Sequence, residues 1–553
     1  MNIFRLLRFF LPLQNPLGFD IADFVELGVA ALLVAAILLR TQIEAMLRNL
    51  ALRPAWSMGL LAVLPIVLRL MLLGQHPVPV PSVSDDFSYL LLGDTLAHFR
   101  LANPVHPMHR FFETVFVQQE PTYSSIYPLG QGLVLAIGQL LFRLPWAGVA
   151  LSIGVLCALC YWMLRAWVTP AWALAGGLLA VMEFGPLNQW MNTYWGGAVS
   201  AIAGCLVFGS LPRLWKNATR RDAALLGVGL GLQVLTRPFE SVLLALCILP
   251  ALIPILRRNV AAVALLAALP AVGLTLLQDK AVTGNWLTLP YMESRYQYGV
   301  PATFTFQRMP APHSPLTREQ QWDYQAQTDV HNESPAYFTR LLSRVRFFRF
   351  FFLTPLCAAL LFFLPSLRRR RYLWVAASAA IFSLGTNFYP YYYPHYIAAL
   401  TGVFVLMSVV GLERLSRLGR DAARLVVLLC VAHFAFWYGL HFFGNPDVFA
   451  ATGPYETWDF INFGDAEGRI AIGRQLAQSP GRQLVFVHYG PAHLLREWIH
   501  NAADIDGAPV VWALDLGPDE DAKLVRYYPH RTAWLVEPDA VPPRLTPFSS
   551  PAQ

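Results

Sequence analysis

Apolar residues dominate this chain in stretches of about 15 to 20, separated by short polar connections and by two long ones. Because a helix needs about 20 apolar residues to cross a bilayer, the pattern predicts about twelve transmembrane helices. They fall near residues 21–40, 57–74, 146–165, 171–185, 194–211, 222–236, 239–256, 259–277, 348–366, 372–387, 395–411 and 425–443. The stretch 129–142 is left open, since it fits either a span or a helix lying in the membrane interface.

Composition supports a polytopic membrane protein. Of the 553 residues, 56% are hydrophobic and 14% are charged, whereas soluble domains carry roughly 25% charged residues. The net charge of +7 lies in short arginine clusters between apolar stretches, so it does not indicate nucleic-acid binding. The six cysteines all fall inside apolar stretches and are expected to pack as small apolar residues. We expect the first span to act as an uncleaved insertion signal.

The arginine clusters orient the predicted spans. They occupy connections 40–53, 213–221, 257–258, 368–371 and 414–424, and the positive-inside rule places such connections in the cytoplasm. Loops 75–128 and 279–347 and the tail 444–553 then face outward, and the N-terminus also comes out external. Long connections are usually functional or disordered. Loops 75–128 and 279–347 are rich in aromatic residues and proline, which favours order.

The chain divides into a membrane domain at 1–443 and an external C-terminal domain at 444–553. In the tail, helical stretches at 465–479, 491–500 and 518–525 alternate with apolar strands at 484–488, 509–514 and 532–536. This alternation predicts a small α/β domain with a parallel sheet. Neither a Walker loop nor a dinucleotide fingerprint is found in the sequence, so nucleotide hydrolysis is not indicated as an energy source.

Two adjacent carboxylates, Asp85 and Asp86, follow the second span in the first external loop. Ser84 precedes them, and apolar residues at helical spacing follow, which predicts a helix on the membrane surface with both acids in its first turn. One interpretation is helix capping, with Ser84 as the N-cap and both acids stabilised by the helix dipole. The other is catalysis, because repulsion and desolvation would raise one pKa and make that carboxylate a better general base.

Four short motifs resemble those of the GT-C glycosyltransferases, polytopic enzymes that use polyprenyl-phosphate sugars. Their relatives include protein O-mannosyltransferases and lipid A aminoarabinose transferases. The motifs are Asp85-Asp86-Phe87-Ser88-Tyr89, Tyr127-Pro128-Leu129-Gly130, Leu235-Thr236-Arg237-Pro238, and the segment from Asp279 through Thr283-Gly284-Asn285 to Pro290-Tyr291. The family commonly has Glu at the second acidic position. Tyr127-Pro128 stands where aminoarabinose transferases have Lys-Pro-Pro, which argues against that particular activity.

The resemblance implies roles for individual residues. Asp85 matches the catalytic base and Asp86 the accompanying acid. Arg237 suits a phosphate contact, although an arginine at the end of a span also commonly snorkels to the interface. Further candidates for substrate or phosphate binding are Tyr127, Arg295, His395 and Tyr396. For Arg295 the alternative is a solvated loop charge, and for His395 and Tyr396 it is the aromatic belt at the membrane surface.

A metal site is a separate possibility in the first external loop. His98, His106, His109 and Glu113 are of the ligand types that bind divalent metals, but their spacing matches no rigid metal motif. Polar loop histidines without a metal are the alternative. We therefore assign no metal ligand and leave a divalent-metal cofactor open.

The sequence thus favours an α-helical polytopic GT-C-like protein of a bacterial inner (cytoplasmic) membrane, with a small external α/β domain. The implied activity is transfer of a hexosyl or pentosyl group from a polyprenyl-phosphate donor to a glycan, lipid or protein acceptor on the periplasmic face, with Asp85 as general base. Two alternatives remain. A lipid or polar-solute transporter or flippase would show inverted repeats, and none is visible. A non-catalytic scaffold of the cell envelope would leave Asp85 dispensable.

Overall fold

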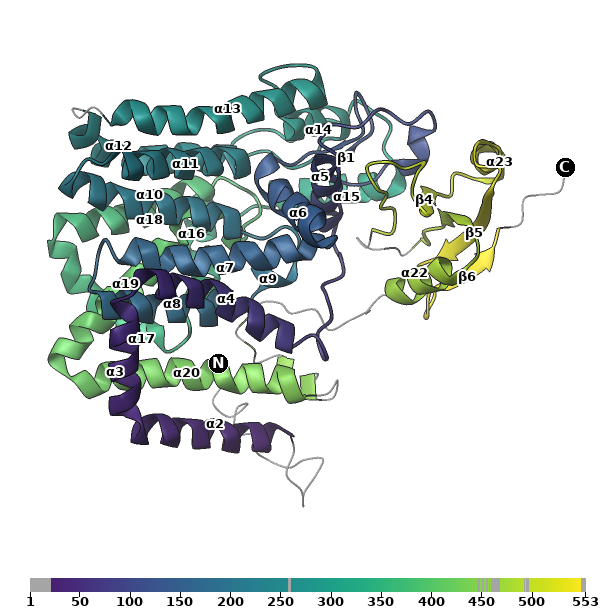
Figure 1. Ribbon diagram of the computed structural model, residues 1–553. Helices are drawn as coiled ribbons and strands as arrows, with labels where there is room; N and C mark the ends of the chain where they lie inside the picture. The colour runs from purple at the N-terminus through teal and green to yellow at the C-terminus, as the bar shows by residue number, and fades with distance from the viewer. Residues whose placement is uncertain are drawn as a thin grey trace.

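The computed structural model describes residues 21–256, 260–444 and 468–548, apart from 492 and 494–496, together with 448–449, 452–453, 456 and 458. Most of the long helices run side by side in a stack, and a small sheet domain lies beyond one end of it (Figure 1). The long helices are α2 (Ile21–Leu38), α4 (Pro54–Met71), α7 (Pro145–Leu164), α8 (Pro170–Phe184), α10 (Ala198–Lys216), α11 (Arg220–Thr236), α12 (Pro238–Leu256), α13 (Ala261–Thr283), α18 (Arg370–Thr386), α19 (Thr401–Leu418) and α20 (Arg420–Phe443).

The described residues contain a helix in every range predicted to span the membrane, but fewer of them qualify as spans. Seven are long and apolar enough to cross a bilayer, or eight if a bent pair is counted. That pair, Tyr337–Phe351 with Leu356–Arg368, covers the predicted span at 348–366 and is bent by 112°. Other predicted spans are shorter, such as α8 with 15 residues and α11 with 17. The polytopic helical fold is confirmed, and the expected number of about twelve spans exceeds the seven or eight that meet the length criterion.

The two ends of the bundle differ in chemistry. At one end, the α7–α8 connection meets the start of α18 and the end of α19, and Arg369, Arg371, Arg414 and Arg417 gather there. We call this the arginine end. The other end carries the two long loops, and we call it the loop end. The predicted cluster at 40–53 lies at this arginine end as well, since Arg165 in the α7–α8 connection donates to the carbonyl of Ala51. The cluster at 257–258 lies outside the described residues.

Helix α6 (Leu129–Phe142) resolves the stretch left open by the sequence. Its N-cap, Pro128, lines a cavity at the loop end. Trp146, in the first turn of α7, donates a hydrogen bond to the carbonyl of Met191 and lies 5.0 Å from the guanidinium carbon of Arg69, near the end of α4. Because α6 begins and ends at the same end of the bundle, it does not cross the bundle as the long helices do.

The loops at the loop end fold into short, well-packed elements. The first contains α5 (Ser84–Ala97), the 3-10 helix η1 (His109–Phe112) and a hairpin of β1 (Val117–Gln118) and β2 (Ser124–Ser125). The second contains α14 (Pro290–Tyr298), α15 (Arg318–Asn332), α16 (Tyr337–Arg344) and η2 (Val345–Phe351), which continues the chain into α17 (Leu356–Phe363) and η3 (Leu364–Arg368). The acids of α5 lie in its first turn as predicted, but Val83 is the N-cap and makes no side-chain cap, so Ser84 does not cap this helix.

The C-terminal domain has a four-stranded sheet in the order β4-β3-β5-β6. The strands β3 (Arg482–Val487), β4 (Val510–Leu514) and β5 (Arg531–Glu537) are parallel, and β6 (Arg544–Pro547), which was not predicted, pairs antiparallel with β5. Helices α22 (Arg469–Gln478) and α23 (Pro518–Tyr527) match two predictions. The helix predicted at 491–500 is wrong where the chain is described, at 491, 493 and 497–500; its remaining positions lie outside the described residues, as do 465–467.

The domain docks on the first long loop. Phe111 packs on Phe486 in a shared apolar cluster, and Tyr123 donates a hydrogen bond to the carbonyl of Asn501. The backbone N–H of Ala503 donates to Asp94 at 2.7 Å. The boundary predicted at 443/444 borders a stretch that lies mostly outside the described residues.

One close helix contact positions the loop-end residues that follow α18. The 3-10 helix η4 (Pro394–Leu400) lies against α10, where a Cβ added to Gly204 would sit 1.7 Å from the carbonyl oxygen of Ala399. Only glycine permits this approach.

We predict that Gly204→Ala lowers the free energy of unfolding by about 1–3 kcal/mol, because an extra methyl in a close-packed contact forces backbone movement. Gly273→Ala in α13 is the matched control, since a Cβ there meets nothing within 4 Å and helix propensity favours alanine. Thermal unfolding of both purified variants measures the difference. Equal melting temperatures would contradict the assigned contact.

Candidate active site

A cavity of about 470 Å³ opens at the loop end, within the size range of small-molecule sites. Its walls come from α5, the segment after β2, the α11–α12 junction, α14, α15 and residues 389–396. Six of the seven residues proposed from the sequence line it: Asp85, Tyr127, Arg237, Arg295, His395 and Tyr396. Asp86 does not.

Asp85 presents its carboxylate to this cavity. The hydroxyl of Tyr127 donates a hydrogen bond to Oδ1 of Asp85, and the Tyr127 ring stacks on Tyr89 with centroids 4.2 Å apart. Burial raises the pKa of Asp85, while the Tyr127 hydrogen bond and the charge of Arg237 act in the opposite direction. A raised pKa makes the carboxylate a stronger base, and these two interactions favour its charged form, so Asp85 is suited to accept a proton.

Asp86 faces the protein interior. It is 1% exposed, and its carboxylate accepts the backbone N–H groups of Tyr194 at 2.8 Å and Ser82 at 3.1 Å. Burial raises its pKa to about 7. Because these contacts join the start of α5 to the segment before α10, Asp86 acts here as a positioning residue that fixes the direction of its neighbour Asp85.

Arg237 is the cation of the cavity. It ends α11, and Pro238, the first residue of α12, prevents the helix from continuing. Its guanidinium carbon lies 5.3 Å from the ring centre of Tyr396. Within the described part of the chain, the guanidinium makes no hydrogen bond or ion pair. Its charge acts on the nearby carboxylates of Asp85 and Glu240, but neither forms an ion pair with it. A half-buried guanidinium that no ion pair neutralises in the described residues is suited to bind an anionic ligand.

Arg295 lines the cavity but is largely engaged. Its Nε donates to the carbonyl of Pro301 at 2.8 Å and Nη2 to that of Ala302 at 2.9 Å, and its guanidinium carbon lies 5.0 Å from the Tyr291 ring centre. Burial lowers its pKa. These bonds hold the loop after α14, so Arg295 has less capacity for a phosphate than Arg237.

His395 and Tyr396 enter the wall from η4. The His395 ring is buried and lies 4.9 Å from the Trp195 ring in an edge-on arrangement. Tyr396 contacts Tyr389 with ring centres 4.7 Å apart. Together with Tyr291 and Tyr127 they give the cavity an aromatic lining with hydroxyl groups, which suits both faces of a sugar.

Two acids in the wall were missed from the sequence. Glu240 lies one turn after Arg237, and the Tyr389 hydroxyl is 3.5 Å from its Oε1. An acid inside an apolar stretch is itself a signal of function and could have been used to find it. Asp323 on α15 accepts a hydrogen bond from Gln327 at 2.7 Å, and burial raises its pKa to about 7. Its polar surroundings in the sequence carry no comparable signal.

The loop histidines do not gather into a metal site. His106 contacts Oδ1 of Asp506 and the hydroxyl of Tyr528, both at 3.1 Å, and so joins the first loop to the C-terminal domain. His98 lies 3.4 Å from Asp94, and His109 lies 4.0 Å from Glu120. Among the described residues, no three His, Cys, Asp or Glu side chains are grouped to hold a metal ion.

Comparison with known proteins gives structural likenesses only. No family model and no curated protein matches the chain. ArnT from Cupriavidus metallidurans in the apo state is 16% identical, with a TM-score of 0.47 over 87% of this chain and 93% of that one. Its complex with undecaprenyl phosphate is 14% identical, with a TM-score of 0.48 over 87% of this chain and 92% of that one. A third similar structure is the oligosaccharyltransferase AglB from Archaeoglobus fulgidus, in complex with an inhibitory peptide and a dolichol-phosphate. It is 12% identical, with a TM-score of 0.42 over 87% of this chain and 69% of that one.

With identities of 16% or less and TM-scores below 0.5, these are likenesses of structure, and no role is transferred from them to this chain.

Proposed function

We propose that this protein is a membrane glycosyltransferase that moves a hexosyl or pentosyl group from a polyprenyl-phosphate donor to an acceptor hydroxyl. The observation that carries the proposal is that one cavity has in its walls an acid hydrogen-bonded to a tyrosine and an arginine without an ion pair. The hydroxyl of Tyr127 donates to Asp85, whereas the guanidinium of Arg237 makes no hydrogen bond or ion pair to any described residue. A base opposite a phosphate-binding cation is what a single displacement at an anomeric carbon requires.

The proposed reaction is one step. The Asp85 carboxylate takes the proton of the acceptor hydroxyl, and the acceptor oxygen forms a bond to the anomeric carbon. The bond from that carbon to the phosphate oxygen breaks, and its electron pair remains on the departing polyprenyl phosphate. The planar guanidinium of Arg237 stabilises this charge through two-point contacts. A single displacement inverts the anomeric configuration.

The cavity walls suit the other parts of such a donor. Phe239 and Val330 offer an apolar surface to the first isoprenoid units, and tyrosines on the opposite segments face the sugar. The cavity lies at the loop end, and the arginine clusters lie at the other. By the positive-inside rule, we place the reaction and the C-terminal domain on the periplasmic side of a bacterial inner membrane.

Replacing the base tests the proposal directly. We expect Asp85→Asn to lower the rate of transfer by at least about 100-fold, the usual size of a general-base effect. The assay follows labelled sugar from a polyprenyl-phosphate donor to membrane acceptors. Asp329→Asn, an exposed position on α15, is the matched control and should transfer normally. Normal transfer by well-folded Asp85→Asn protein would rule out the mechanism.

Acidity should control the rate through the same group. Since burial raises the pKa of Asp85, transfer should fall as the pH is lowered through that raised value, because the base becomes protonated. The Tyr127 hydrogen bond favours the charged form, so Tyr127→Phe should raise the pKa further and shift the acid limb to higher pH. A charge-assisted bond of about 1.5–3 kcal/mol corresponds to a shift of roughly 1–2 pH units. This role would be contradicted if the pH at which the rate falls on the acid side were the same or lower in Tyr127→Phe than in the parent protein.

Donor binding should depend on Arg237. We expect Arg237→Gln to raise the KM for the donor by about tenfold or more, and Arg237→Lys to give an intermediate value because it keeps the charge without the fork. Arg308→Gln, an exposed position in the second long loop, is the control. Steady-state kinetics with varied donor concentration gives the comparison, and an unchanged KM in Arg237→Gln would remove this residue from donor binding.

A further inference from the structure

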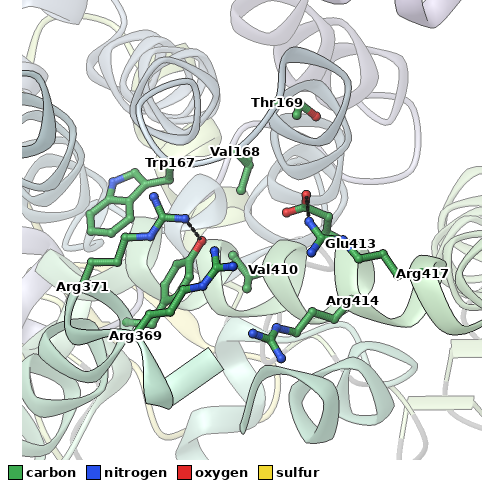
Figure 2. A pocket seen from close by; sticks show the side chains of 10 residues that line it. Trp167, Val168, Thr169, Arg369, Arg371, Val410, Glu413, Arg414 and Arg417 are labelled. Atoms are coloured by element: carbon green, nitrogen blue, oxygen red, sulfur yellow. Dashed lines mark hydrogen bonds and ion pairs between the residues drawn. The ribbon is translucent and has the colours of Figure 1, made fainter. Parts of the chain in front are cut away.

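A second hollow, of about 250 Å³, lies at the arginine end, where the chain is not expected to do chemistry. Figure 2 shows Arg369 and Arg371 on one side of it and Arg414 and Arg417 on the other, with Glu413 as the one acid in its lining. The positive-inside rule accounts for arginines at this end, but it does not require four of them to converge on one hollow from segments more than 40 residues apart.

Two of these arginines have partners among the described residues. Arg417 forms an ion pair with Glu413 at 2.8 Å. Arg371 donates to the Tyr372 hydroxyl at 2.9 Å, and its guanidinium carbon lies 4.5 Å from the centre of the Tyr372 ring. The guanidinium groups of Arg369 and Arg414 make no hydrogen bond or ion pair to any residue that the structure describes. The hollow therefore holds positive charge that the protein leaves uncompensated.

Two helix N-termini add to this charge. Thr169, the N-cap of α8, and Arg369, the N-cap of α18, both line the hollow, and neither makes a side-chain cap. Unsatisfied N–H groups at a helix start carry partial positive charge and bind anions. Guanidinium forks and helix N-termini are both well matched to phosphate oxygens.

The surroundings favour a lipid over a soluble anion. Large apolar side chains on η3, α18 and α19, close in sequence to the arginines, are strongly exposed: Leu364 at 57%, Leu373 at 54% and Leu418 at 78%. The hollow also lies where α18 begins and α19 ends, at the expected depth of lipid headgroups. Basic pockets between membrane helices at this level bind anionic headgroups.

We propose that the hollow bounded by Arg369, Arg371, Arg414 and Arg417 binds the phosphate of an anionic phospholipid, with the acyl chains lying along the exposed leucines. This site is separate from the cavity at the loop end, and its occupancy does not depend on the proposed transfer reaction.

The test uses purified full-length protein, stripped of lipid in detergent and titrated with dioleoyl phosphatidylglycerol. Native mass spectrometry measures the bound fraction. We expect Arg369→Gln/Arg414→Gln to weaken binding by at least about tenfold, since each charge-assisted contact is lost. Because neither guanidinium has a protein partner, this variant should keep the melting temperature of the parent. Arg369→Lys/Arg414→Lys, which keeps the charge, should retain part of the binding.

The control is Arg220→Gln/Arg221→Gln, which removes the same charge from exposed positions at the start of α11. It should bind the lipid as the parent protein does. Equal affinity in the Gln variants at 369/414 and in the parent would overturn the site, as would an equal loss in the control. A titration with inorganic phosphate alone distinguishes a lipid headgroup from a soluble anion. If it binds the hollow as tightly as the lipid does, the occupant is a soluble anion and the lipid assignment is wrong.

Discussion

The carboxylate of Asp86 ties the candidate site together. By accepting the backbone N–H groups of Ser82 and Tyr194, it fixes the start of α5 against a segment more than 100 residues away. Backbone groups are strong donors, and a buried carboxylate that receives them is held in one orientation. Asp85 is the preceding residue on the same helical turn, so its approach to Tyr127 and the cavity follows from this tether.

Much of the fold could be predicted from apolar runs, because a membrane-spanning helix is set by local composition. The count of spans could not, since the short helices and the bent Tyr337–Arg368 pair depend on how each element packs. The strand β6 lacks a strong pattern of its own and forms by pairing with β5. Likewise, Ser84 has the chemistry of an N-cap, but the chain begins the helix one residue earlier.

The candidate site also contains residues that the sequence predicts and residues that only the fold brings to it. Asp85, Arg237 and Tyr127 stand in short motifs, so they were found from the sequence and lie together in the structure. The two acids Asp85 and Asp86 read alike in sequence, and only the fold separates the one facing the cavity from the one facing backbone amides. Asp323 was missed because its proximity to the cavity depends on the second long loop folding over the first, which no local pattern records.

Helix α5 also connects the candidate site to the C-terminal domain. Its first turn carries Asp85, and its last turn carries Asp94, which receives the Ala503 N–H of the C-terminal domain. The domain also contacts the first turn, where the ring of Phe87 lies 4.9 Å from that of His500, so it holds this 14-residue helix at both ends. A displacement of the domain would therefore move Asp85 with the rest of the helix, and by thermodynamic reciprocity a ligand that fixed Asp85 would favour one position of the domain.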